Sequence, residues 1–104
     1  MKEPKELPYE AKARIADNLF LQRRRAELSQ GELGEFAMVS PGQIGKIEKG
    51  ESIGMLDTWV RLAGALSVTL DELLAGVTWT PGEIELEIDA GYTVTFEVED
   101  RVEN

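Results

Sequence analysis

The stretch from Leu28 to Gly50, LSQGELGEFAMVSPGQIGKIEKG, most constrains how this chain can fold. Ser29 and Glu32 fit a capping box, in which the Ser side chain accepts from the third helical amide and the Glu side chain reaches back. Ser40 repeats the signal and is followed by Pro41, at a helical position where the missing N–H is not needed. The spacing leaves room for about two helical turns and a short turn. Two short helices joined by a tight turn are therefore predicted.

Apolar residues of this stretch recur at helical intervals. Leu33 and Ala37 are four positions apart, and Ile44 and Ile47 are three apart, so each pair keeps one helical face. Gly34 has no side chain, and we expect it to let the two helices approach closely. The residues assigned to the inner faces are Leu33, Phe36, Ala37, Val39, Ile44 and Ile47.

Helical patterns also lie on both sides of this stretch. Residues 1–8 are polar and read as a loose arm, and a helix is predicted from Tyr9 to Glu27. A further helix is predicted from Met55 to Leu66, and Thr69 opens a short fifth helix that ends before Gly76. The inner face of the fourth helix is assigned to Leu56, Trp59, Val60, Ala63 and Leu66. The sequence thus predicts a helical domain over residues 9–76.

The apolar period changes to two after Gly76. Residues 77–82 read as a connector, and residues 83–89 and 92–99 then alternate apolar and polar positions, as strands do. A two-residue loop, Ala90-Gly91, would place apolar residues opposite polar ones. A three-residue loop beginning at Asp89 pairs Ile88 with Tyr92 and keeps one face apolar, so a two-stranded antiparallel hairpin with this loop is predicted.

The apolar face of this hairpin needs a cover, because an isolated two-stranded hairpin is marginal in water. One cover is the same hairpin of a second subunit, which makes residues 77–104 a linker and a dimerisation element. The alternative is a flap that completes the core of the monomer, with Trp79 packed beneath it. The candidate dimer interface comprises Ile84, Leu86, Ile88, Tyr92, Val94, Phe96 and Val98.

The negative charge is concentrated in the tail. The chain has a formal net charge of -9; residues 1–80 contain 10 basic and 12 acidic residues, and residues 81–104 contain 1 basic and 8 acidic residues. The helical part is therefore nearly neutral, and a basic edge of it can still bind a polyanion. We expect the acidic tail to face away from such a ligand.

The composition argues against several classes of site and location. The chain contains no Cys and no His, which removes thiolate metal sites, the usual general base and the commonest neutral metal ligand. No catalytic motif is present, so we expect neither an enzyme, a metal nor a cofactor. No apolar run approaches the roughly 20 residues of a membrane span, and no signal peptide follows the charged start, so a cytoplasmic protein without membrane contact is expected.

From about residue 15 to 75 the chain resembles the Cro/C1-type helix-turn-helix family, the XRE-like transcriptional regulators. The segment Asn18 to Ala26 is similar to a version found in short actinobacterial members. Many spaced positions agree at once, which makes the resemblance specific. They are Arg23, Leu28-Ser29-Gln30, Leu33, Val39-Ser40, Ile44, Ile47-Glu48-Lys49-Gly50, Leu56-Asp57-Thr58, Leu62-Ala63-Gly64-Ala65-Leu66 and Leu70-Asp71-Glu72-Leu73-Leu74.

The resemblance implies a mainly α, lambda-repressor-like domain of five helices, here followed by the β-hairpin. It also implies that the third helix enters the major groove of double-stranded DNA and that Arg23 pairs with Glu48. The implied function is a sequence-specific transcriptional regulator, expected to be a homodimeric repressor. The residues implied to contact DNA are Gln30, Ser40, Pro41, Gly42, Gln43, Lys46, Lys49, Arg24 and Arg25.

Three features depart from the family pattern. Pro41 and Gly42 offer no side-chain donors, and Met38 stands where a Gly is frequent at the turn. Gly31, Gly42 and Gly45 each weaken helix propensity by about 1 kcal/mol relative to Ala. Base readout by few side chains is therefore expected, aided by backbone amides, DNA shape or a partner. The acidic tail leaves an alternative function open, that of an antitoxin or adaptor whose hairpin binds a basic protein partner.

Overall fold

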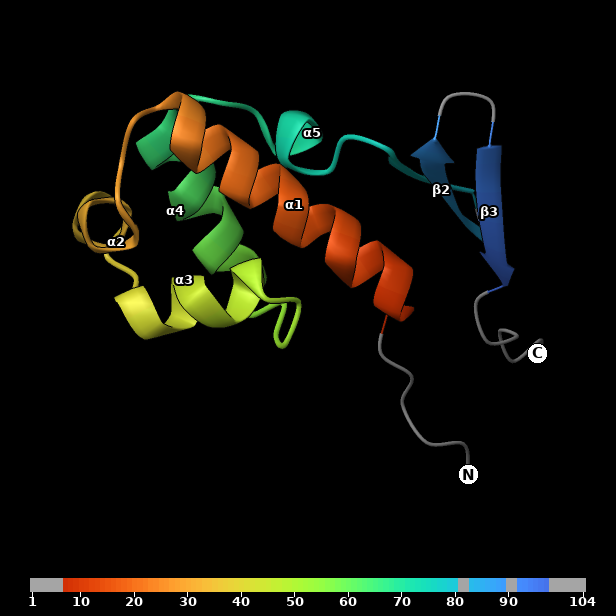
Figure 1. Ribbon diagram of the computed structural model, residues 1–104, viewed down its shortest axis with the longest axis horizontal. Helices are drawn as coiled ribbons and strands as arrows, with labels where there is room; N and C mark the ends of the chain where they lie inside the picture. Colours follow the sequence, from red (N-terminus) through yellow and green to blue (C-terminus); the bar gives the residue numbers. More distant parts are fainter. Residues whose placement is uncertain (1–6, 81–82, 90–91, 98–104) are drawn as a thin grey trace, which may run out of the picture.

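The computed structural model describes residues 7–80, 83–89 and 92–97. Five helices and three strands follow one another along the chain (Figure 1). The helices are α1 (Tyr9–Arg25), α2 (Gln30–Ala37), α3 (Pro41–Glu48), α4 (Leu56–Leu66) and α5 (Leu70–Leu73). The strands are β1 (Val77–Thr80), β2 (Glu83–Asp89) and β3 (Tyr92–Glu97). The mainly helical fold class is confirmed, and the small sheet lies at one end of the molecule.

Two of the predicted capping boxes are complete. The Ser29 hydroxyl accepts from Glu32 N at 3.0 Å, and the Glu32 carboxylate accepts from Ser29 N at 2.9 Å. Thr69 and Glu72 repeat this exchange at the start of α5, at 3.1 and 3.0 Å. The hydrogen bond from the Ser29 N–H lowers the pKa of the Glu32 carboxyl most, and the hydrogen bond with the Ser29 hydroxyl lowers this pKa further. Local sequence therefore sets where α2 and α5 begin.

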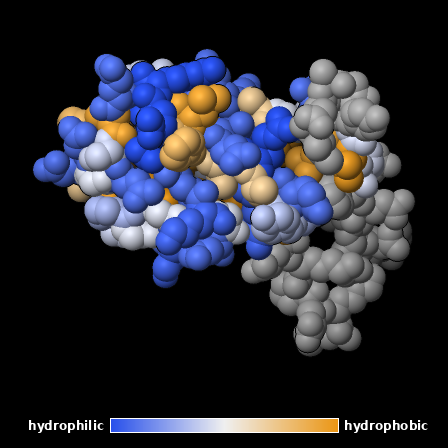
Figure 2. Space-filling view, viewed as in Figure 1, coloured by the Kyte–Doolittle hydropathy of each residue, from blue (hydrophilic) through white to orange (hydrophobic). Residues whose placement is uncertain are grey.

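The core is apolar and lies between the helices. Most residues assigned to the inner faces from the sequence are buried as predicted. The buried cluster comprises Ile15, Leu19, Leu33, Ala37, Val39, Ile44, Ile47, Trp59, Leu62, Ala63, Leu66 and Leu73. On the face shown in Figure 2, hydrophilic residues prevail over the helical part, and hydrophobic ones form small separate areas.

Three residues assigned to the inner faces are exposed, so those assignments were wrong. Phe36 is 67% exposed because it lies about 100° around α2 from Ala37. Val60 is 54% exposed, since α4 turns Leu62 and Ala63 inward instead. Leu56, at 73%, is the first residue of α4 and lines an apolar pocket of about 270 Å³.

The turn between α2 and α3 depends on a close backbone approach at Gly34. A Cβ added there would lie 2.5 Å from the Val39 carbonyl oxygen, which is too close for any side chain. Val39 N donates to Gly34 O at 2.9 Å. Met38 between them adopts a left-handed conformation, with φ 58° and ψ 45°. The close approach expected from Gly34 is present, and the turn strains Met38 as a left-handed residue with a side chain.

The sheet has three antiparallel strands, so the prediction that residues 77–82 form only a connector was wrong. Val77 pairs with Leu86, and Trp79 pairs with Ile84. The four residues of β1 alternate apolar residues with Thr, which is too short a pattern to separate a strand from a loop in the sequence. The third strand gives β2 a partner on both sides.

The predicted register between β2 and β3 is correct except at its end. Ile84 pairs with Phe96 and Leu86 with Val94, as expected. Tyr92, however, pairs with Asp89 and not with Ile88, because the register shifts between Glu87 and Asp89. An extra residue in β2, a β-bulge, restores the alternation that a shorter connection would otherwise break. Residues 90, 91 and 98 lie outside the described residues.

The sheet packs onto the N-terminal half of α1. The Leu86 side chain is 1% exposed, and Val77 packs against the helical core. The Arg14 side chain donates to the Glu87 carbonyl oxygen and crosses Gly76, where an added Cβ would meet it. These contacts favour the alternative of a flap that covers the helices, and they argue against a free hairpin.

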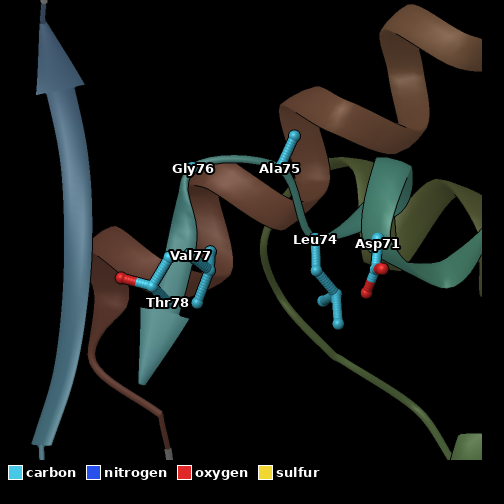
Figure 3. A pocket seen from close by; sticks show the side chains of 6 residues that line it. All are labelled: Asp71, Leu74, Ala75, Gly76, Val77 and Thr78. Carbon is cyan, nitrogen blue, oxygen red and sulfur yellow. The ribbon is translucent and has the colours of Figure 1, made fainter. Parts of the chain in front are cut away.

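The link from α5 to β1 is also fixed to α1. Asn18 Nδ2 donates to Leu73 O at 3.0 Å and to Ala75 O at 2.8 Å. A shallow pocket of about 380 Å³ lies along this link, where Figure 3 shows Leu74 and Asp71 on the helix side and Val77 and Thr78 on the strand.

We expect Leu86→Ala to lower the free energy of unfolding by about 2–4 kcal/mol, since it removes a fully buried side chain. The neighbouring exposed Glu85→Ala serves as the control and should change it little. Urea unfolding followed by circular dichroism would measure both. Equal stability of Leu86→Ala and the parent chain would show that the sheet adds nothing to the folded domain.

We expect Met38→Gly to raise the free energy of unfolding by about 1 kcal/mol, because Gly adopts the left-handed conformation without the steric penalty. Met38 is 82% exposed, so little packing is lost. Met38→Ala keeps the left-handed strain and should bring no gain. Thermal unfolding of the two variants compares them directly.

Candidate nucleic-acid interface

The helix α3 has one buried face and one exposed face. Ile44 and Ile47 point into the core, at 0% and 1% exposure. Pro41, Gly42 and Lys46 are exposed on the other side. The short helix therefore presents a small surface of few side chains to solvent, as the sequence predicts.

The start of α3 is capped by Ser40. Its hydroxyl accepts from Gln43 N at 3.1 Å. Only this half of the predicted second capping box is recorded for α3, whereas α2 and α5 show both halves. Pro41 has no N–H, so the Gly42 amide is the first of the helix, and first-turn amides lack an acceptor inside the helix. A Cβ added at Gly42 would meet nothing within 4 Å, so the backbone here is open to a ligand.

Gln43 is less free than the sequence suggests. Its side chain is half-buried. A Cβ added at Gly54 would lie 2.9 Å from Gln43 Nε2, so the Gln43 amide rests against the loop that follows α3. A side chain larger than hydrogen at position 54 would push Gln43 away. Sequence reasoning missed this contact because no local pattern links positions 43 and 54.

The last turns of α1 and α3 are tied by a buried ion pair. Arg23 Nε donates to Glu48 Oε2 at 2.7 Å, and Arg23 Nη2 donates to Glu48 Oε1 at 2.9 Å. The two side chains are 9% and 6% exposed. Arg23 Nη1 also donates to Leu28 O at 2.8 Å. The Glu48 hydrogen bonds raise the pKa of Arg23, so this guanidinium stays charged at every pH that the protein tolerates.

Gln30 extends this network to α2. Its Nε2 donates to Glu48 Oε1 at 3.0 Å, and its Oε1 would be 3.6 Å from a Cβ on Gly45. The first residue of α2 therefore lies against the C-terminal half of α3. The pairing of Arg23 with Glu48 stands as the family resemblance implies, and the third partner, Gln30, carries no sequence signal of its own.

The remaining basic residues of the predicted interface lie on the surface. Arg24, Arg25 and Lys49 are exposed at the ends of α1 and α3. The Arg24 guanidinium carbon stands 5.7 Å from the centroid of the Phe20 ring, a cation–π distance. Because the Arg23 ion pair joins the last turns of these two helices, it brings their basic ends into one part of the molecule.

The residues of the candidate dimer interface are distributed differently. Leu86 is buried within the chain, and Ile84 and Val94 are half-buried. Ile88, Tyr92 and Phe96 lie in the strands, and Val98 lies outside the described residues. The face of the hairpin proposed for dimerisation is thus already partly covered by α1.

The opposite face of the sheet is polar. Thr78, Glu85 and Thr95 occupy adjacent positions across the three strands and are exposed, as is Glu87. The hypothesis of a basic protein partner for this face stays a prediction. Within the described ranges, no group of three acidic side chains is placed to hold a metal ion, and no helix has the length and apolarity to cross a membrane.

The geometry of α2, α3 and the turn between them is that of a helix-turn-helix, and the family comparison agrees. The model of the family described as HTH_3, Helix-turn-helix, matches residues 20–73, more than half of the chain. The chain belongs to this family. The resemblance to Cro/C1-type regulators is confirmed, and the chain is a DNA-binding helix-turn-helix protein of the transcription-regulator type.

Comparison with solved structures identifies regulatory proteins that share this fold. The restriction-modification controller protein C.AhdI from Aeromonas hydrophila is 26% identical with a TM-score of 0.61, covering 62% of this chain and 98% of its own. The hypothetical transcription factor NHTF from Neisseria is 28% identical with a TM-score of 0.59, covering 70% of this chain and 86% of its own. No curated protein matches the chain.

The structural neighbours also include an enzyme. Hydroxypropylphosphonic acid epoxidase from S. wedmorenis is 16% identical with a TM-score of 0.58, and the match covers 88% of this chain and 54% of the epoxidase. At this identity the likeness shows the fold alone. The match to the helix-turn-helix family and the regulatory names of two neighbours above 25% identity favour a regulator over an enzyme.

We expect a double-mutant cycle of Arg23→Met, Glu48→Met and both together to show strong coupling. Each single change leaves a buried charge without its partner and should cost about 3–5 kcal/mol of folding free energy. The double change removes both charges and should cost clearly less than the sum of the single changes. Additive costs in urea unfolding would mean that the two side chains contribute independently.

Proposed function

We propose that this protein is a homodimeric, sequence-specific repressor that docks α3 in the major groove of double-stranded DNA. The observation that carries the proposal is the fixed orientation of α3. Its inner face is held by Ile44 and Ile47, and its last turn is held by the buried Arg23–Glu48 pair. This leaves the face around Gly42 and Lys46 as a rigid, exposed surface. A rigid helix face of this size matches the major groove.

Two side chains are proposed to read bases. Lys46 is exposed at the middle of the outer face of α3 and can reach guanine O6 and N7. Gln43 can bond adenine N6 and N7 after its amide leaves Gly54. The open backbone at Gly42 supports close approach of the Pro41-Gly42 corner to the DNA. With only two such side chains, base-pair specificity rests partly on DNA shape.

The phosphate contacts are proposed to lie at helix ends. Ser40 and the first amide of α3 stand at one end, where a helix dipole favours a phosphate. Gln30, together with Lys49, Arg24 and Arg25, lies around the joined last turns of α1 and α3. Basic side chains there supply the salt-dependent part of the affinity and set the register on the duplex.

A homodimer is the natural form for such a regulator. One α3 with two base-reading side chains gives limited affinity, and a two-fold dimer doubles the contacts on a two-fold operator. Repression then needs only occupancy of DNA that overlaps a promoter. The regulatory name of the controller protein C.AhdI, at 26% identity, supports a regulatory role of this kind.

A mobility-shift assay on the DNA upstream of its own gene and on selected genomic fragments tests the proposal. We expect binding that weakens steeply as salt concentration rises. Failure to enrich any genomic fragment, with only weak binding of equal strength to all sequences, would contradict sequence-specific regulation.

We expect Lys46→Ala to cost about 1–3 kcal/mol of binding free energy and to relax the preference at one base pair. Lys12→Ala is the control, since it removes the same charge from the sheet-facing half of α1. Its effect on affinity should be small and independent of sequence. Equal losses for the two variants would show that only net charge matters and that α3 does not read the groove.

A further inference from the structure

The strand β3 is an edge strand with an open row of backbone groups. In the part of the chain that the structure describes, β3 pairs with β2 alone (Figure 1). Glu87 N donates to Gly76 O at 2.8 Å, so the Glu87 backbone faces the β1 side. Backbone groups of successive residues point to opposite sides of a strand. The Leu86 backbone therefore faces Val94 in β3, and the backbone groups of Thr93 and Thr95 face outward.

Among the described residues, this outer edge lacks the usual protection against pairing. Natural edge strands carry Lys, Pro, a bulge or a covering segment. The five residues from Tyr92 to Phe96 contain no charge and no Pro, and the register shift lies in β2. Thr93 and Thr95 are exposed, and Val94 is only half-buried. An edge of this kind favours the addition of another strand.

The strand is also nearly symmetric about Val94. It reads aromatic, Thr, Val, Thr, aromatic from Tyr92 to Phe96. An antiparallel pair centred on Val94 places Val94 opposite Val94, Thr93 opposite Thr95 and Tyr92 opposite Phe96. Self-complementarity of this kind is what a two-fold interface between identical subunits requires. Thr–Thr and aromatic pairs are favourable cross-strand neighbours.

We propose that β3 pairs antiparallel with β3 of a second copy, in the register centred on Val94, to form one six-stranded sheet. The outward backbone groups of Thr93 and Thr95 then exchange hydrogen bonds across the two-fold axis. The proposal rests on the homodimer of the proposed function and names its interface. It moves that interface from the apolar face, where Leu86 is already buried, to the open edge.

The charge of the tail selects the register. Residues 81–104 carry 1 basic and 8 acidic residues, so a second tail is repelled except where the paired stretch is uncharged. The Val94-centred register pairs the five uncharged residues with one another and leaves Glu97 outside. A register centred on Thr95 would bring Glu97 into the pairing. Dimerisation through β3 should therefore strengthen with salt, whereas DNA binding weakens.

The decisive variant is Thr93→Lys/Thr95→Lys. Within one chain these positions pair with Glu87 and Glu85, so the new ammonium groups meet opposite charges and the fold is supported. Across the proposed interface, however, they lie opposite one another, and like charges in that position destabilise pairing. Light scattering at tens of micromolar should show a dimer for the parent chain and at least a tenfold weaker dimer for the variant. Circular dichroism checks the fold.

The matched control is Glu85→Lys/Thr93→Lys/Thr95→Glu, which has the same net charge as the double Lys variant and places opposite charges across the Val94-centred register. Within the chain it keeps opposite charges at the paired positions 85 and 95. It should remain a dimer. If the double Lys variant does not fold, Thr95→Pro removes an outward N–H without a charge and should also give a monomer.

A monomeric parent chain, or a dimer that the double Lys variant leaves unchanged, overturns the proposal. Loss of the dimer in the Lys/Glu control overturns the register. These outcomes are separate from failure of the DNA-binding proposal. Binding of a single half-site that depends on Lys46 would persist in a monomer, and a dimer through β3 would persist in a protein that binds no DNA.

Discussion

The position of α3 depends above all on the buried ion pair between Arg23 and Glu48. The helix spans only Pro41–Glu48, and helices this short are unstable in isolation. Gly42 and Gly45 lower its helix propensity further, by about 1 kcal/mol each relative to Ala. Its orientation must therefore come from tertiary contacts. The bidentate Arg–carboxylate geometry fixes the angle at its last turn, which two apolar contacts alone would leave adjustable.

The same pair links three helices and not two. Arg23 belongs to α1, Glu48 to α3, and Gln30 of α2 donates to the same carboxylate. The first half of α3 is positioned independently, by the close approach of Gly34 to Val39 O. Met38 adopts a strained backbone conformation at this turn. The protein thus accepts local strain at one end of α3 and a desolvated charge pair at the other, which fits a helix whose orientation matters for function.

Features that depend on neighbouring residues were predictable from the sequence, and features that depend on distant contacts were not. The caps at Ser29 and Thr69 are local, and so is the spacing of Leu33 and Ala37. The strand β1 has a pattern of only four residues, and its pairing with β2 supplies the stability that its sequence does not show. Alternation alone predicts a three-residue loop, whereas the structure has a bulge in β2. An extra residue in the strand and a longer loop restore the register equally well, so the sequence could not distinguish them.

The same distinction between local and distant contacts applies to the candidate site. The resemblance of the sequence to a family placed Arg23 opposite Glu48, which periodicity alone could not do. The contact of Gln43 with Gly54 depends on the path of the loop after α3, and no rule of local sequence sets that path. Exposure of Phe36 likewise follows from which part of α2 meets the core. The residue types at this surface were therefore predictable from the sequence. Whether each side chain is exposed or held by a neighbouring residue was not.

The fold separates the acidic sheet from the helix that is proposed to bind DNA. The sheet carries Glu85 and Glu87 on its exposed face, and such carboxylates repel DNA at close range. The molecule measures 46 Å along its longest axis, and the sheet and α3 lie toward different ends of it (Figure 1). A Debye length of about 8 Å at physiological ionic strength screens the repulsion over such a distance. Arg14 and Asn18 of α1 bind the carbonyl groups of Glu87, Leu73 and Ala75, so the same helix that orients α3 at one end holds the acidic sheet away at the other.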